Sequence, residues 1–136
     1  MEYKKDCTTP SRVDRDLADQ RLSQYHFARQ FVKDKVVLDL GCAAGRGLSV
    51  LAQVARKVLV LDGLEESKSI DFANNHAQPN LEFVMSHSDQ IPLRSETLDV
   101  VVCLEGTRQF ANREQLMNEV RRCLSSDGLL LISAPN

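Results

Sequence analysis

The residues that most clearly suggest chemistry lie in residues 36–47, which read Val-Val-Leu-Asp-Leu-Gly-Cys-Ala-Ala-Gly-Arg-Gly. The apolar start is typical of a strand that is buried on both faces of a parallel sheet. Three glycines follow, and apolar residues then recur at helical spacing. A strand, a glycine turn and a helix present backbone N–H groups and the positive end of a helix dipole to a ligand. The stretch therefore predicts a cofactor-binding turn.

The spacing of the glycines argues against one class of cofactor. A dinucleotide-binding fingerprint needs G-x-G-x-x-G. Counted from Gly41, the other two glycine positions hold Ala43 and Arg46, and counted from Gly45 the last position holds Val50. The sequence therefore does not predict NAD binding in either register.

Strands alternate with helices along the chain. We expect strands over residues 36–40, 57–62, 81–85, 98–104 and 129–133, and helices over residues 11–32, 46–56, 65–77 and 113–125. Asn112 is expected to cap the last helix at its start, and Asp127-Gly128 to end it with a glycine cap. The alternation predicts an α/β fold, a doubly wound, mostly parallel, Rossmann-like sheet of about five strands with helices on both faces. Residues 1–136 are expected to form one domain, with a flexible lead-in over 1–10.

Composition narrows the class of protein. The 136 residues are 43% hydrophobic and 26% charged, which is ordinary for a soluble globular domain. The formal net charge of −2 gives no basic field of the kind that indicates nucleic-acid binding. Four cysteines stand far apart with no C-x-x-C pair, so we predict no metal site and a reducing, cytoplasmic compartment. No apolar run approaches the ~18 residues of a membrane-spanning helix, so no membrane association is expected.

Polar residues recur where the expected strands end, and open α/β sheets bind ligands at that edge. Asp62 follows Gly41 by 21 positions, close to the ~20-residue spacing at which a carboxylate reaches a ribose diol. A strand-end Asp can also be no more than a turn former. The other ends are Ser86-His87-Ser88-Asp89 and Leu104-Glu105-Gly106.

Three blocks of the sequence resemble the class I S-adenosylmethionine-dependent methyltransferases. Residues 39–47 read D-x-G-x-A-x-G-x-G, similar to the family's D/E-x-G-x-G-x-G motif with Ala43 at one glycine position. Residues 83–101 resemble the family's strand, adenine-binding acid, Leu-Pro and Phe-Asp-x-Val, with His87 at the position of the acid. Residues 112–132 resemble its Glu-x-x-Arg-x-Leu helix, acidic-Gly turn and apolar strand. Together with a similar lead-in helix, the resemblance covers about residues 20–136.

The resemblance implies that the cofactor is S-adenosylmethionine, with S-adenosylhomocysteine as its product. The glycine turn would hold the methionine end, Asp62 the ribose, and Gly63 with His87 and Ser88 the adenine. The full set of expected cofactor-binding residues is Asp39, Gly41, Ala43, Gly45, Asp62, Gly63, His87, Ser88 and Leu104.

The catalytic residues are left open, because methyl transfer needs a general base only if the acceptor must lose a proton. Glu105 and His26 are the candidates. Relatives often read Glu-x-x-Glu-His from the position of Glu105, whereas this chain reads Glu-Gly-Thr-Arg-Gln. Alternatively, Glu105 is a cofactor-side or structural acid, and His26 is a partly exposed helix residue.

The implied function is methyl transfer to an unidentified small-molecule acceptor. The alternatives are a catalytically inactive module of the same fold that binds the cofactor or dimerises, and a different nucleotide binder. The family's last two strands are missing from this sequence, so strand 129–133 would be an exposed apolar edge. We expect a homodimer through this edge, another partner that covers it, or a longer protein of which this is a piece.

Overall fold

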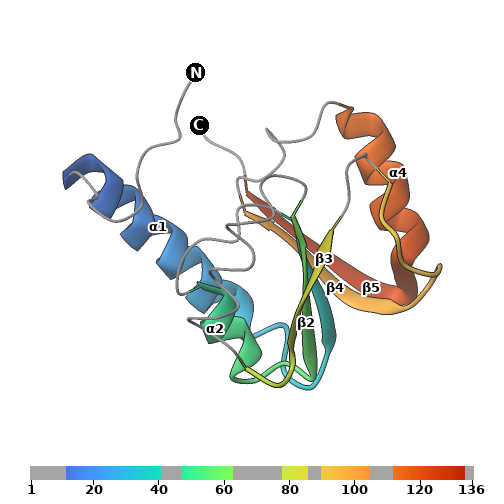
Figure 1. Ribbon diagram of the computed structural model, residues 1–136, viewed down its shortest axis with the longest axis horizontal. Coiled ribbons are helices and arrows are strands. Elements are labelled where there is room, and N and C mark those ends of the chain that lie inside the picture. The colour runs from blue at the N-terminus through green and yellow to red at the C-terminus, as the bar shows by residue number, and fades with distance from the viewer. Residues whose placement is uncertain (1–11, 41–46, 63–77, 86–89, 105–111, 134–136) are drawn as a thin grey trace.

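A five-stranded parallel sheet forms the centre of the computed structural model, which describes residues 12–40, 47–62, 78–85, 90–104 and 112–133 (Figure 1). In chain order the elements are α1 (Arg12–Arg29), β1 (Val36–Leu40), α2 (Gly47–Ala52), β2 (Lys57–Asp62), β3 (Leu81–Met85), β4 (Leu98–Leu104), α4 (Arg113–Cys123) and β5 (Leu124–Ser133). The strand order is β3-β2-β1-β4-β5, and all neighbouring strands are parallel. This architecture confirms the α/β, Rossmann-like prediction; the helix expected over 65–77 lies outside the described residues.

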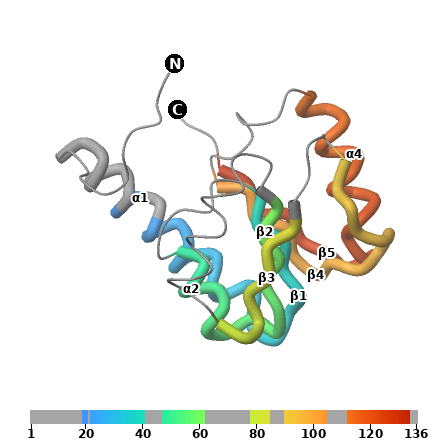
Figure 2. The backbone as a smooth tube through the Cα atoms, viewed as in Figure 1, coloured from blue at the N-terminus to red at the C-terminus, as the bar shows by residue number. Residues whose placement is uncertain are grey.

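Alternate side chains of the strands belong to two separate apolar cores. One core joins α1 and α2 to the sheet through Val37, Val58, Val60, Val100 and Val102. The other joins α4 to the opposite face through Leu38, Leu40, Leu59, Leu61, Val101 and Cys103. Figure 2 shows α1 and α2 on one side of the strands and α4 on the other. Because both faces are covered, the strands read as continuous apolar runs, and four of them begin and end at the predicted residues.

The first two helices are shorter than predicted, because hydrogen bonds and turns near their ends stop them. Phe31 N–H donates to the Ala28 carbonyl at 2.9 Å, which tightens the chain just after α1. Asp34 then adopts a left-handed φ of 60° and turns the chain into β1. At the end of α2, the Asn80 side-chain amide donates to the carbonyls of Ala52 and Ala55 at 2.8 and 3.1 Å. The first bond satisfies a carbonyl group that the helix end leaves free, and the second holds the chain three residues beyond the helix.

The predicted start of α4 is confirmed and its predicted end is wrong. Asn112 Oδ1 accepts a bond from Gln115 N–H at 3.0 Å, as an N-cap does. The helix ends at Cys123, and Leu124 is extended with φ −72° and ψ 140°. Gly128 is therefore no helix cap. It lies in β5, whose pairing with β4 is irregular between its Leu124 and Leu129 bridges.

Gly128 is needed for space in this irregular stretch. A Cβ at that position would lie 2.7 Å from Leu124 Cδ2 and 3.0 Å from the Ser125 carbonyl oxygen. The close return of the chain toward Leu124 therefore accounts for the glycine that the sequence pattern assigned to a helix end.

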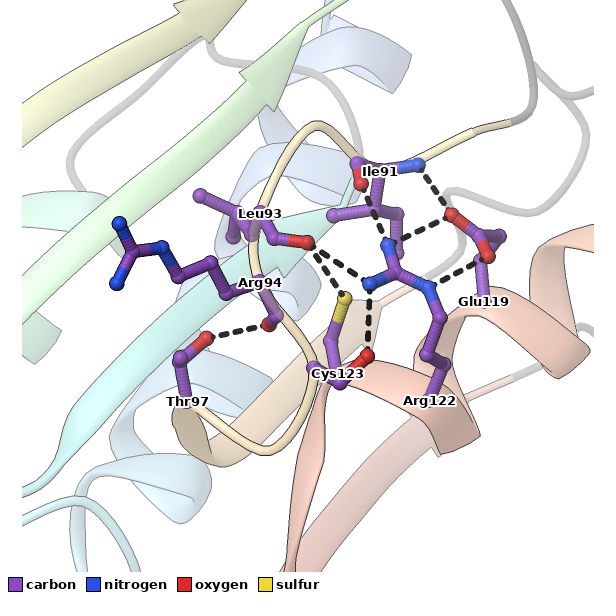
Figure 3. A network of polar contacts seen from close by, with 8 residues as sticks. Ile91, Leu93, Arg94, Thr97, Glu119, Arg122 and Cys123 are labelled. Atoms are coloured by element: carbon purple, nitrogen blue, oxygen red, sulfur yellow. Dashed lines mark hydrogen bonds and ion pairs between the residues drawn. The ribbon is translucent and has the colours of Figure 1, made fainter.

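Arg122 of α4 fixes the segment that leads into β4 (Figure 3). Its guanidinium donates to the Glu119 carboxylate from Nε and Nη2, at 2.8 and 2.9 Å. It also donates to the carbonyls of Ile91 and Leu93 at 2.8 and 2.9 Å. Glu119 Oε1 accepts the Ile91 N–H at 2.9 Å, so the two charged side chains together hold this loop to the helix. The bond from Arg122 lowers the pKa of Glu119 below its ordinary value.

Replacing Arg122 by lysine tests this anchor. An ammonium keeps the charge but lacks the planar fork that serves a carboxylate and two carbonyls at once. We expect Arg122→Lys to lower the free energy of unfolding by ~1–2 kcal/mol, since the side chain is 35% exposed and its charge partly screened. Urea denaturation measures the loss. Arg121→Lys, at an exposed position on the same turn, is the matched control. Equal midpoints for the two variants would contradict the anchoring role.

Candidate functional site

The candidate site lies where the parallel strands end, at the centre of the sheet. β1 pairs with β2 on one side and with β4 on the other, so the strand order reverses next to β1. Open α/β sheets bind ligands outside the carboxyl ends of the strands at such a switch point. Three predicted residues belong to the carboxyl ends of these adjacent strands: Asp39 in β1, Asp62 as the last residue of β2, and Leu104 as the last residue of β4.

Seven other predicted site residues lie outside the described part of the chain. They are Gly41, Ala43, Gly45, Gly63, His87, Ser88 and Glu105. Their assignment to cofactor or acceptor therefore stays a prediction.

Asp39 is the one buried charged side chain among the residues whose burial the structure describes, with 1% of its surface exposed. It occupies a strand position between Leu38 and Leu40, both fully buried. The hydroxyl of Tyr25 in α1 donates a hydrogen bond to Asp39 Oδ2, with an O–O distance of 2.8 Å. Burial raises the pKa of Asp39 to about 7, and the bond from Tyr25 opposes that rise by favouring the carboxylate. Near neutral pH, this carboxyl group is therefore close to the balance between its two protonation states.

Tyr25 also contacts the start of α2. A Cβ built on Gly47 would overlap the ring of Tyr25, so the ring lies directly against the backbone there. The sequence pattern places Tyr25 only on the apolar face of its helix. The sequence signal for the contact with Asp39 is a hydroxyl group on the face of the helix that packs against the sheet, together with an acidic residue inside an apolar strand.

His26 lies on the exposed side of α1. It lines a hollow of about 330 Å³ together with Arg29, Gln30, Lys33 and Val54. The Val54 carbonyl accepts a bond from Asp34 N–H, just before β1 begins, so the hollow lies toward the amino ends of the strands. The structure therefore does not group His26 with Asp39, and its role as a base stays a prediction.

The described part of the chain has neither a cluster of metal ligands nor a membrane-spanning helix. No group of three or more His, Cys, Asp and Glu side chains there could hold a metal ion. Among the same residues, no helix has the length and apolarity to cross a membrane.

Comparison with known proteins adds a family match. A family model for a methyltransferase domain matches residues 38–132. The ubiquinone/menaquinone biosynthesis C-methyltransferase UbiE of Campylobacter jejuni is 27% identical over 104 residues, which cover 74% of this chain and 44% of that protein. A probable S-adenosylmethionine-dependent methyltransferase of Mycobacterium tuberculosis is 28% identical over 132 residues, covering 90% of this chain and 47% of that protein. The chain thus spans less than half the length of these relatives.

Solved structures share the fold. The YcgJ protein of Bacillus subtilis superposes with a TM-score of 0.73 at 21% identity, over 84% of this chain and 50% of its own. The [4+2]-cyclase SpnF superposes with a TM-score of 0.72 at 16% identity, over 96% of this chain and 48% of its own. One of these neighbours is a cyclase, so the fold by itself does not identify the reaction.

The raised pKa of Asp39 predicts how stability depends on pH. Between pH 3.8 and about pH 7, Asp39 keeps its proton in the folded protein. In the unfolded chain, where the pKa of this residue is 3.8, the proton has been released. This contribution to stability is complete below the unfolded pKa and is lost as the pH rises through about 7. At ~1.4 kcal/mol per pH unit, the loss between about pH 5 and pH 7 should be roughly 2 kcal/mol.

Asp39→Asn should remove that slope from the free energy of unfolding, measured by urea denaturation between about pH 5 and pH 8. Asp127→Asn, at an exposed position, should keep the wild-type slope. A wild-type slope in the Asp39 variant would show that this carboxyl group is ionised throughout the range.

Proposed function

The chain belongs to the methyltransferase domain family, and on that premise we propose that it binds S-adenosylmethionine and transfers the methyl group to a small-molecule acceptor. The observation that carries the proposal is the position of Asp39 and Asp62 on adjacent strands, at the sheet edge where such folds bind ligands. The names of the two relatives support it, since both are methyltransferases and one acts in quinone biosynthesis.

The described residues at this edge suit such a cofactor. A carboxylate at the end of β2, Asp62, could accept hydrogen bonds from two ribose hydroxyls. Leu104, half-buried at the end of β4, offers apolar surface at the same edge of the sheet, with β1 between the two strands. We assign the remaining contacts to the glycine segment, as Gly41, Ala43 and Gly45 for the methionine end, and to Gly63, His87 and Ser88 for the adenine.

The protein would contribute mainly alignment. The bound cofactor supplies a methyl group that its sulfonium already activates, so little covalent help is needed from the chain. Holding an acceptor in line with that methyl group can lower the barrier by up to ~7–11 kcal/mol. Glu105 and His26 stay proposals for a base, required only if the acceptor must lose a proton.

We further propose a cytoplasmic location and a homodimer through β5. Cys103 and Cys123 are both buried thiols, as expected in a reducing compartment. β5 is an outer strand of the described sheet, and it exposes 39% of Leu129 and 50% of Ile132. An apolar edge invites pairing with another strand, and a second copy would supply an identical one. The other candidate cover is further chain, since the matched region covers only 44% and 47% of the two relatives.

Calorimetric titration with S-adenosylhomocysteine tests the cofactor assignment, with NAD as the competing ligand. Wild-type protein should bind the former alone. Asp62→Ala should weaken binding by roughly 1–3 kcal/mol, because ribose hydroxyls lose their acceptor. Glu82→Ala is the matched control, since Glu82 is an exposed acid near the amino end of the neighbouring strand β3. Equal affinities for the wild type and Asp62→Ala would remove the ribose assignment. Binding without turnover in an acceptor screen would favour the inactive module.

Sedimentation velocity tests the dimer. Wild-type protein should sediment as a concentration-dependent dimer, and the double variant Leu129→Lys/Ile132→Lys as a monomer, because two charges at the edge oppose pairing. Gln53→Lys/Asn118→Lys adds the same charge at exposed positions away from β5 and should stay dimeric. A monomeric wild type, or a dimer that survives the edge substitutions, would refute this interface.

A further inference from the structure

One side chain contacts the chain on both sides of the glycine segment. The hydroxyl of Tyr25 donates to Asp39 at 2.8 Å, next to the last residue of β1. The ring of the same Tyr25 lies against Gly47, the first residue of α2. Residues 41–46 join these two points along the chain. We propose that Tyr25 is a positioning residue that holds the end of β1 and the start of α2 at the spacing that lets the glycine segment bind S-adenosylmethionine.

The packing of α1 gives Tyr25 a fixed place from which to act. One turn further along the helix, Ala28 is 1% exposed, and Val32 just beyond the helix is fully buried. Both belong to the core that also contains Leu48 and Leu51 of α2. The backbone that carries Tyr25 is therefore anchored to α2 as well as to the sheet. This anchoring fixes the position of the hydroxyl, which would vary if Tyr25 were a freely rotating surface side chain.

The two contacts of Tyr25 need different parts of the side chain. The hydroxyl donates a hydrogen bond to the carboxyl group of Asp39. Because that group is buried, losing the bond would cost free energy. The aromatic ring fills the space above Gly47, where no Cβ fits beside it. Phenylalanine would keep the ring and lose the donor, whereas alanine at position 47 would displace the ring. The two substitutions therefore separate the two contacts.

The expected functional effect is a loss of preorganisation. If the ends of β1 and α2 are held in place before the ligand arrives, binding does not have to order them, and affinity is higher. This inference rests on the proposed function, since it assigns Tyr25 a role in binding the same cofactor. It adds a residue from α1, which lies before the glycine segment in the chain.

The test is a double-mutant cycle on affinity for S-adenosylhomocysteine, measured by calorimetry well below the melting temperature. Tyr25→Phe should weaken binding roughly 5–30-fold. In an Asp39→Ala background, which has no acceptor for the hydroxyl, the same change should have a much smaller effect, because the hydroxyl acts through that carboxyl group. Gly47→Ala should weaken binding at least as much as Tyr25→Phe. Val120→Ala is the control: it removes buried volume from the core on the α4 side of the sheet and should lower the melting temperature without changing the affinity.

A second measurement needs no ligand. Amide hydrogen exchange across residues 40–47 should be faster in Tyr25→Phe than in the wild type, by more than any change in β2 of the same protein. Unchanged exchange across 40–47 would overturn the inference whatever the cofactor is. So would unchanged affinity of Tyr25→Phe in a wild type that binds S-adenosylhomocysteine. A wild type that binds neither test ligand overturns the proposed function instead, while the exchange result still decides whether Tyr25 positions the segment.

Discussion

The burial of one carboxyl group, Asp39, imposes the strictest condition on this structure. A group that can carry charge is costly inside a sheet of valine and leucine unless a hydrogen-bonding partner accompanies it. The bond from Tyr25 supplies a partner from a helix that precedes the whole sheet in the chain. The position of α1 is thereby tied to the chemistry at the end of β1, and the helix belongs to the site as much as to the core.

The covered faces of the sheet explain why function is confined to its rim. Both faces pack against helices, so a ligand can approach the central strands only at their ends. Polar groups within the layers serve structure instead. Arg122 and Glu119 show this on the α4 side, where each bond that they make holds a loop or a helix in place. A charged residue within an apolar strand therefore suggests a functional site, whereas a charged residue on a helix surface suggests structural support, even when both are fully paired.

Four strands could be predicted to the residue, because each is a mainly apolar run that a polar residue or a glycine bounds at each end, as expected of strands in a parallel sheet covered by helices. The end of α4 could not. Asp127-Gly128 has the composition of a helix cap, but pairing between Leu98 and Leu124 ends the helix earlier, and that pairing joins distant parts of the chain. The contact of Tyr25 with Asp39 was missed for the same reason, since it depends on how α1 crosses the sheet. The spacing that predicts Asp62 at a ribose needs only the local order of strand, turn, helix and strand.

The fit between the ring of Tyr25 and the bare backbone of Gly47 limits how this sequence can drift. A side chain at position 47 becomes acceptable only after residue 25 has become smaller, and a smaller residue 25 gives up the hydroxyl on which Asp39 relies. Neutral change at these three positions is therefore epistatic, and a path from one workable combination to another passes through a less stable intermediate. Grafting a glycine turn from a distant homologue into this chain would meet the same obstacle unless the matching helix were transferred with it.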